Sequence, residues 1–157
     1  YDIVVTSGGA SVGDHDLVRQ ALINIGAEID CGKVAMKPGK PLMAGRIGKQ
    51  VVLGLPGNPS SAFVTAFLYL LPLVRHMAGC PAPLPAEGTA EISEAYPAGG
   101  NRTEYIRAHV ADGKIRPFSK QDSGLTNPIA HANALLIREI DSPALVTGEK
   151  VQYLALG

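Results

Sequence analysis

Two lysines stand three residues apart in the segment KPGKP, residues 37–41. Two prolines and a glycine restrain its backbone, so it can form neither a helix nor a central strand. Holding two ammonium groups close together costs free energy unless an anion lies between them. A solvated basic loop is the alternative interpretation, but the restrained backbone favours an anion site at Lys37 and Lys40.

A second candidate site is the glycine-rich segment SGGASVG, residues 7–13, which follows a strand-like run and precedes a predicted helix. Glycines let backbone N–H groups approach a ligand closely, and the N-terminus of the next helix favours an anion. The segment is neither GxGxxG nor a Walker loop, so a turn that binds nothing is an equally good interpretation. The residues that could bind a ligand here are Ser7, Gly8, Gly9, Ser11 and Gly13.

Acidic residues follow this segment in the first turn of the predicted helix. Asp14 and Asp16 could simply interact favourably with the helix dipole. A carboxylate beside a phosphate-binding loop could instead hold Mg²⁺ as a bridge to the ligand. His15 could ligate a transition metal, although a single histidine at a helix start is more often only solvated.

The segment GLPGNPSS, residues 54–61, ends a predicted strand and begins a helix. Asn58 suits the N-cap and Pro59 the first helical position, and Ser60 and Ser61 lie in the first turn. Such an N-terminus favours an anion, although the same residues could serve only to start the helix.

The second half of the chain offers fewer candidates. Arg102 and Arg107 flank TEYI, residues 103–106, and residues 121–124 form a polar loop. Both features could also be plain surface.

Strand–turn–helix units are expected to position these segments. The predicted strands are residues 3–5, 33–36, 42–45 and 51–55, and the predicted helices are residues 14–25 and 58–77, with a bend near Pro72. This order predicts an α/β layer with a parallel sheet. Because ligands bind outside the carboxyl ends of the strands in such sheets, the candidate segments should converge on one edge.

A proline-rich linker at residues 79–85 separates this region from one of different character. Short strands are predicted there at residues 90–95, 103–110, 114–117, 134–138 and 150–156, and no helix is convincing. We therefore expect two domains: an α/β domain at residues 1–80 and a small β-barrel or sandwich at residues 86–157.

Composition disfavours several classes of protein. The net charge is zero and tryptophan is absent, which disfavours binding to nucleic acid or to an anionic membrane. Two cysteines cannot build a disulfide framework and no signal peptide is visible, so a cytoplasmic protein is expected. The longest apolar stretch, residues 62–74, is interrupted by Thr65 and Pro72 and is too short to span a bilayer. The chain opens at Tyr1 on a strand-like run, so we expect that an N-terminal portion is missing.

In this order and at these spacings, SGGASVG with Asp16, KPGKP and GLPGNPSS resemble the MoeA/gephyrin family of molybdopterin molybdenumtransferases. The three-motif string is highly specific, and the resemblance covers the whole chain. It implies that residues 1–80 belong to a three-layer, parallel-sheet molybdopterin-binding α/β domain that is truncated at its N-terminus. Residues 86–157 would be the small all-β barrel domain at the C-terminus. Ala10 stands where the family commonly has Val.

The resemblance implies that the protein inserts molybdate into adenylylated molybdopterin and releases AMP, supported by Mg²⁺. By motif position, Asp16 resembles the family's metal-associated carboxylate and joins Lys37 and Lys40 as a catalytic candidate. Lys, Arg and Ser donors suit a tetrahedral dianion, and insertion needs positioning and charge neutralisation more than a nucleophile. The further substrate-binding candidates are Lys33, Pro56, Gly57, Asn58, Pro59, Ser61, Arg102 and Ser123.

The resemblance also implies a homodimer of the full-length protein, with an adenylyltransferase and molybdoenzymes as partners. We expect that the first part of the family's α/β domain and its N-terminal domains are missing from this sequence. A second acidic residue of the metal site is expected in that missing region, so the chain alone could be inactive. Two alternatives stay open. One is a molybdopterin adenylyltransferase-like domain, against which KPGKP and the β-rich region argue; the other is a gephyrin-like scaffold module that binds peptides.

Overall fold

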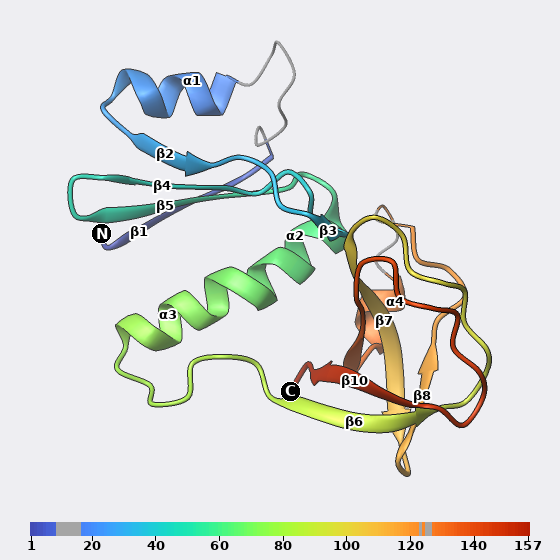
Figure 1. The fold of residues 1–157 in the computed structure, drawn as a ribbon. Coiled ribbons are helices and arrows are strands. Elements are labelled where there is room, and N and C mark those ends of the chain that lie inside the picture. Colours follow the sequence, from blue (N-terminus) through green and yellow to red (C-terminus); the bar gives the residue numbers. More distant parts are fainter. Residues whose placement is uncertain (9–16, 123, 125–126) are drawn as a thin grey trace.

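A computed structural model of the protein describes residues 1–8, 17–122, 124 and 127–157. The predicted site residues Gly9, Ser11, Gly13, Asp16 and Ser123 lie outside the described residues. A sheet flanked by helices and a second, closed sheet lie side by side (Figure 1).

The first sheet has the strand order β1-β5-β4-β2. Its strands are β1 (Ile3–Ser7), β5 (Gln50–Leu55), β4 (Met43–Ile47) and β2 (Glu28–Cys31). Only β1 and β5 are parallel, so the sheet is mixed rather than wholly parallel as predicted. The reason is local: the turn at Gly48 and Lys49 joins β4 to β5 as a hairpin, and a connection this short reverses the chain.

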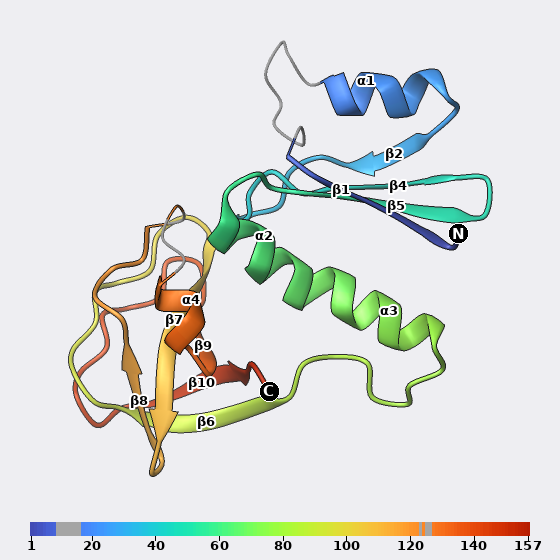
Figure 2. The same cartoon turned by 180° about the vertical axis from the view of Figure 1, so that it is seen from behind.

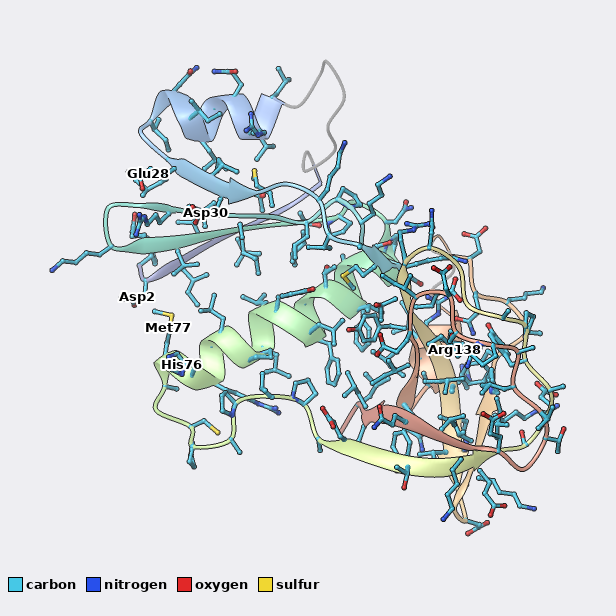
Figure 3. The ribbon with its side chains drawn as sticks, in the orientation of Figure 1. Asp2, Glu28, Asp30, His76, Met77 and Arg138 are labelled. Atoms are coloured by element: carbon cyan, nitrogen blue, oxygen red, sulfur yellow. The ribbon has the colours of Figure 1, made fainter. Side chains whose placement is uncertain are left out.

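Strand β2 was not predicted, because its four residues EIDC include two carboxylates. In the structure it is an edge strand, where charged side chains are tolerated. Glu28 and Asp30 are exposed on it (Figure 3). Glu28 also accepts a hydrogen bond from Nε of Arg46 on β4, at 2.9 Å.

Helices cover both faces of this sheet, which gives the expected three layers. Helix α1 (Leu17–Asn24) lies on one face (Figure 2). The continuous run of α2 (Pro59–Thr65), the π-helical η1 (Ala66–Leu70) and α3 (Leu71–Met77) lies on the other. Successive residues of β5 serve the two faces: Val52 packs with Leu22 of α1, whereas Leu53 packs with Leu70.

The helical run from Pro59 to Met77 changes to π-helix just before Pro72. Proline lacks a backbone N–H, and a π-helical turn relieves the resulting break in the α-helical hydrogen-bond pattern. With 19 residues and a mean hydropathy of 1.2, this helix is long and apolar enough to cross a membrane by length and composition alone. One such helix is weak evidence, and Val64 and Phe67 are buried against other parts of the chain.

The second sheet closes on itself, because β7 pairs with β9 as well as with β8. Closure leaves few strand edges exposed. Around the ring run β7 (Thr103–Ala111), β8 (Lys114–Pro117), β6 (Glu87–Ile92), β10 (Lys150–Ala155) and β9 (Ala134–Arg138). The predicted barrel is thereby confirmed, with Ile92, Ile106 and Leu136 in its core.

Two features of this half were not predicted. Strand β3 (Met36–Lys37) was expected to belong to the first sheet but pairs with β7 of the barrel. Helix α4 (Asn127–His131) is too short to show a helical pattern in the sequence.

We expect Leu136→Ala to lower the free energy of unfolding by about 3 kcal/mol, because the side chain is fully buried in the barrel core. Urea unfolding followed by circular dichroism measures the change. Leu84→Ala is the matched control, since Leu84 is 72% exposed in the linker and should have little effect. Equal losses in the two variants would contradict the assignment of the core.

Candidate functional site

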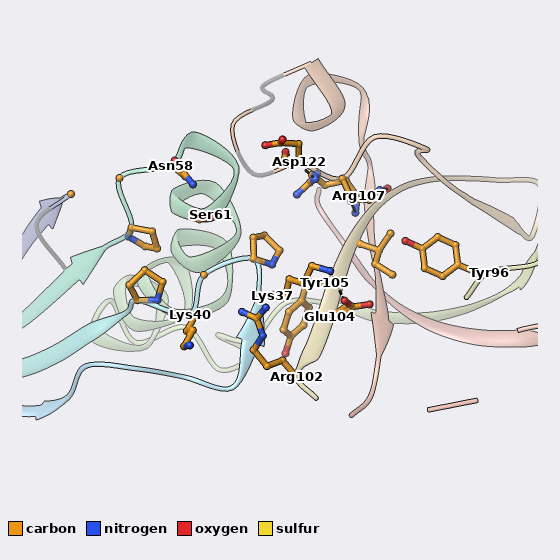
Figure 4. Close-up of a pocket in the computed structure, with 18 residues that line it drawn as sticks. Lys37, Lys40, Asn58, Ser61, Tyr96, Arg102, Glu104, Tyr105, Arg107 and Asp122 are labelled. Atoms are coloured by element: carbon orange, nitrogen blue, oxygen red, sulfur yellow. Dashed lines mark hydrogen bonds and ion pairs between the residues drawn. The ribbon is translucent and has the colours of Figure 1, made fainter. Parts of the chain in front are cut away.

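A cavity of about 760 Å³ lies where the first sheet meets the barrel (Figure 4). One wall comes from loops at the ends of β1 and β5 and from the lysine loop, residues 37–41; the other comes from β7 and the loop after β8. The lining residues are Gly8, Lys37, Pro38, Gly39, Lys40, Pro41, Pro56, Gly57, Asn58, Ser61, Tyr96, Arg102, Glu104, Tyr105, Ile106, Arg107, Gln121 and Asp122.

Backbone contacts hold the lysine loop in place. Lys37 ends β3 and is paired with the barrel, and the carbonyl of Lys40 accepts hydrogen bonds from the N–H groups of Val34 at 3.0 Å and Leu42 at 3.1 Å. Gly39 has φ of +109°, and a Cβ at this position would lie 2.5 Å from the Cγ2 atom of the buried Thr65. The loop therefore rests directly on helix α2, and only glycine fits at that contact.

The two lysines of the loop differ in their surroundings. Lys37 Nζ lies 2.8 Å from Oε1 of Glu104, its register partner on β7. Lys40 is exposed and forms no ion pair with any carboxylate in the described part of the chain. An anion entering the cavity would thus meet the ammonium group of Lys40, which is in no ion pair with a described residue, and that of Lys37, which is already paired with Glu104.

The carboxyl ends of the parallel strands meet at this cavity, as the sequence predicts. Gly8 follows β1 and donates its N–H to the carbonyl of Leu55 at 3.0 Å. A Cβ on Gly8 would lie 3.9 Å from Cα of Gly57, so the two loops run close together. Ser61, in the first turn of α2, is buried and faces the cavity, and the N-terminus of this helix favours negative charge.

The barrel supplies the opposite wall. Arg102 donates from Nη1 to the carbonyl of Met36 at 3.4 Å, which ties it to β3. Gln121 fixes the loop after β8 by hydrogen bonds to the backbone N–H and carbonyl of Arg107, at 3.1 and 2.9 Å. Burial raises the pKa of Tyr96 and of Tyr105, so both phenols stay protonated at neutral pH and can donate hydrogen bonds.

Eight predicted substrate or catalytic residues line this cavity, drawn from four segments of the chain. They are Gly8, Lys37, Lys40, Pro56, Gly57, Asn58, Ser61 and Arg102. Three others in the described part, Ser7, Lys33 and Pro59, do not line it, although Ser7 and Pro59 adjoin lining residues.

Sequence reasoning did not assign seven of the lining residues to the site, although it noted Arg107 and residues 121–124 as features that could equally be plain surface. These seven are Tyr96, Glu104, Tyr105, Ile106, Arg107, Gln121 and Asp122. The charged residues beside the apolar residues of strand β7 were the available signal. That signal does not tell which side chains of the strand face a neighbouring element.

The described lining residues carry four cationic side chains and two carboxylates. The surplus of two positive charges matches a dianion, and Lys, Arg and Ser donors suit its oxygens. Among the described residues, no group of three or more His, Cys, Asp and Glu side chains could hold a metal ion. Asp16, the predicted magnesium ligand, lies outside them.

Two family models match the sequence. One, described as a probable molybdopterin binding domain, matches residues 1–76, and the other, the MoeA C-terminal region (domain IV), matches residues 89–156.

Curated relatives are named molybdopterin molybdenumtransferase. The chain is 32% identical to that of Staphylococcus aureus over 98% of its length and 38% of the relative. It is 34% identical to that of Nostoc sp. over 99% of its length and 38% of the relative. The chain thus spans well under half the length of these relatives.

Solved structures agree with the sequence relatives. The crystal structure of the molybdopterin biosynthesis MoeA protein from Pyrococcus horikosii has a TM-score of 0.82 and 25% identity, over 99% of this chain and 37% of that chain. A molybdenum cofactor biosynthesis protein from Pyrococcus furiosus shares the fold at a TM-score of 0.65 and 22% identity, over 90% of this chain and 55% of that chain.

We expect Gly39→Ala to weaken anion binding, because its Cβ would push the lysine loop away from Thr65. The variant should lose at least about tenfold in affinity for molybdate by calorimetry, the loss that follows from about 1.4 kcal/mol. Gly48→Ala is the matched control: its φ of +57° is also positive, but nothing lies within 4 Å of the added Cβ. Equal affinities for the two variants would show that the contact with Thr65 does not position the lysines.

Proposed function

The chain belongs to the MoeA family, and from this membership we propose that the protein acts in molybdenum cofactor biosynthesis as a molybdopterin molybdenumtransferase. It would insert molybdate into adenylylated molybdopterin and release AMP. The observation that carries the proposal is the convergence of Lys37, Lys40 and Arg102 on one cavity between the first sheet and the barrel.

The cavity suits molybdate as a substrate. Molybdate is a tetrahedral dianion, and the ammonium groups of the lysine loop, the hydroxyl of Ser61 and the guanidinium of Arg102 are donors for its oxygens. Because these donors come from a restrained loop, a helix start and the residue directly before barrel strand β7, they are held in place before the anion arrives. Such preorganised charge acts without reorganisation during the reaction.

The volume of the cavity leaves space for more than an oxyanion. At about 760 Å³ it lies in the range of about 300–1,000 Å³ typical of small-molecule sites. The half-buried rings of Tyr96 and Tyr105 offer apolar surface with polar tips. This combination supports an organic ligand beside the anion, as a pterin substrate requires.

The chemistry proposed here is positioning and charge neutralisation. The described lining residues include neither a cysteine nor a histidine, and Ser61 is the single serine among them. Bringing the oxyanion and the dithiolene of the pterin together in the right orientation can supply much of the rate enhancement.

The finer assignments are further proposals. They are domains at residues 1–80 and 86–157, magnesium held by Asp16, a homodimer, an adenylyltransferase that supplies the substrate, molybdoenzymes that receive the product, and a cytoplasmic location. No carboxylate cluster in the described part of the chain supports the magnesium site, so no step is assigned to the metal.

A molybdopterin adenylyltransferase-like function is less well supported. It would require only the first of the two matched regions, whereas here Arg102, Glu104 and Arg107 of the second region form one wall of the cavity. No described surface favours the peptide-scaffold alternative.

We expect Lys40→Ala to reduce molybdenum insertion by at least about tenfold at low molybdate, because a charge-assisted hydrogen bond contributes about 1.5–3 kcal/mol. The assay uses the full-length protein with adenylylated molybdopterin, molybdate and Mg²⁺, and measures AMP release and bound molybdenum. Lys49→Ala is the control, since Lys49 is exposed in the turn between β4 and β5. Insertion equal to that of the unmodified protein at every molybdate concentration would exclude Lys40 from the anion site.

We expect Asp16→Asn to raise the Mg²⁺ concentration needed for half-maximal AMP release, because an amide is a weaker ligand than a carboxylate for Mg²⁺. A magnesium titration of the same assay measures this shift, with Asp2→Asn as the control on an exposed carboxylate. An unchanged magnesium dependence would leave Asp16 only the role of a helix-start residue.

A further inference from the structure

Arg107 on β7 is the largest fully buried side chain in the described part of the chain, with 1% of its surface exposed. Removing a guanidinium from water costs several kcal/mol unless a counter-charge and hydrogen bonds replace the water. A buried arginine is therefore expected to have a carboxylate partner.

No such partner is present among the described residues. Neither ion pair of this part of the chain includes Arg107. Its guanidinium donates from Nη2 to the backbone carbonyl of Asp122 at 3.4 Å, and its Nε has no hydrogen-bond partner. Burial lowers the pKa of Arg107, and its electrostatic interactions with Tyr96 and Asp122 offset this only in part. Within the described residues, the positive charge of Arg107 is therefore without an ion-pair partner.

Arg107 also has a defined place in the cavity. It lies on the barrel wall beside Asp122, across from Asn58 and Lys40 (Figure 4). The double hydrogen bond from Gln121 to its backbone fixes this part of β7 against the following loop. The position of the charge is therefore set by the barrel and does not depend on a flexible side chain reaching from the surface.

We propose that Arg107 is a buried counter-charge for the anion bound in the cavity, so that the ligand completes the charge pairing that the fold leaves open. The proposal rests on the proposed function and adds a positioning residue to the same site. Arg107 attracts the anion through a wall of low dielectric, where a charge acts more strongly and over a longer distance than in water. Since the attraction scales with ligand charge, Arg107 favours a dianion over a monoanion of the same shape.

Arg138 provides a matched control within the barrel. It is also buried, at 5% exposure, and its Nε is also without a partner. Its Nη2, however, donates to the carbonyls of Pro97 and Pro143, and Arg138 does not line the cavity. It therefore serves to hold two loops together, and its charge should not affect ligand binding.

The test compares Arg107→Met, Arg107→Lys and Arg138→Met in the protein, with molybdate and perrhenate as tetrahedral probes of charge two and one. Isothermal calorimetry measures both dissociation constants, and urea unfolding without ligand measures stability.

We expect Arg107→Met to weaken molybdate binding about tenfold and perrhenate binding about threefold, because the lost attraction is proportional to charge. The ligand-free Arg107→Met protein should be no less stable, since an apolar side chain replaces an unpaired buried charge. Arg107→Lys should stay within about threefold of the unmodified protein for molybdate, and Arg138→Met should not change either constant.

Unchanged molybdate affinity in Arg107→Met, together with weakened binding in Lys40→Ala, would overturn this proposal and leave the proposed function standing. Equal losses for molybdate and perrhenate would overturn it too, because a purely structural role does not distinguish ligand charge. If Arg107→Met does not fold, Arg107→Lys decides: a loss as large as that of Lys40→Ala would refute the counter-charge. Failure of the unmodified protein to bind molybdate would refute both proposals.

Discussion

The site depends on one apolar contact, the packing of the long helix against the outside of the barrel. Val64 and Phe67 of that helix are buried together with Met36 of β3, Leu135 of β9 and Leu154 of β10. This cluster helps to set the distance between the loops at the end of the first sheet and strand β7, which carries Arg107 and directly follows Arg102. Together with the pairing of β3 with β7, it holds the two walls of the cavity in place, so that the four cationic side chains surround a common volume.

The cavity has an excess of positive charge that an anionic ligand can balance. Glu104 already pairs with Lys37, whereas Lys40 and Arg107 have no carboxylate partner in the described structure. The buried one, Arg107, raises the free energy of the ligand-free protein, because its guanidinium has been removed from water. The same charges lower the free energy of the complex with an anion. The arrangement therefore makes the ligand-free protein less stable and raises its affinity for an anion.

Local sequence patterns were enough to predict strands β1, β5, β7, β8 and β9, both long helical segments and the closed barrel. They also pointed to an anion site at the lysine loop and at the helix start that carries Ser61, since restrained backbone and helix-start signals are local. Arg102 entered the predicted site only through the family resemblance. The pairing of β3 with β7 could not be predicted, because it joins residues 67 positions apart through only two residue pairs. The roles of Glu104 and Arg107 depend on that pairing and on the loop held by Gln121, so the sequence offered only their charges.

The pairing of β3 with β7 limits how freely this protein can be rearranged. The chain leaves the barrel sheet after Lys37, forms strands β4 and β5 of the first sheet and the long helix, and re-enters the barrel at Glu87. The barrel sheet therefore includes strand β3, which carries Lys37 of the cavity and belongs to the preceding half of the chain. Recombination at the linker around residues 79–85 would separate that strand from its neighbour. The two halves are consequently expected to have been inherited as one unit, even though their sheets look like independent modules.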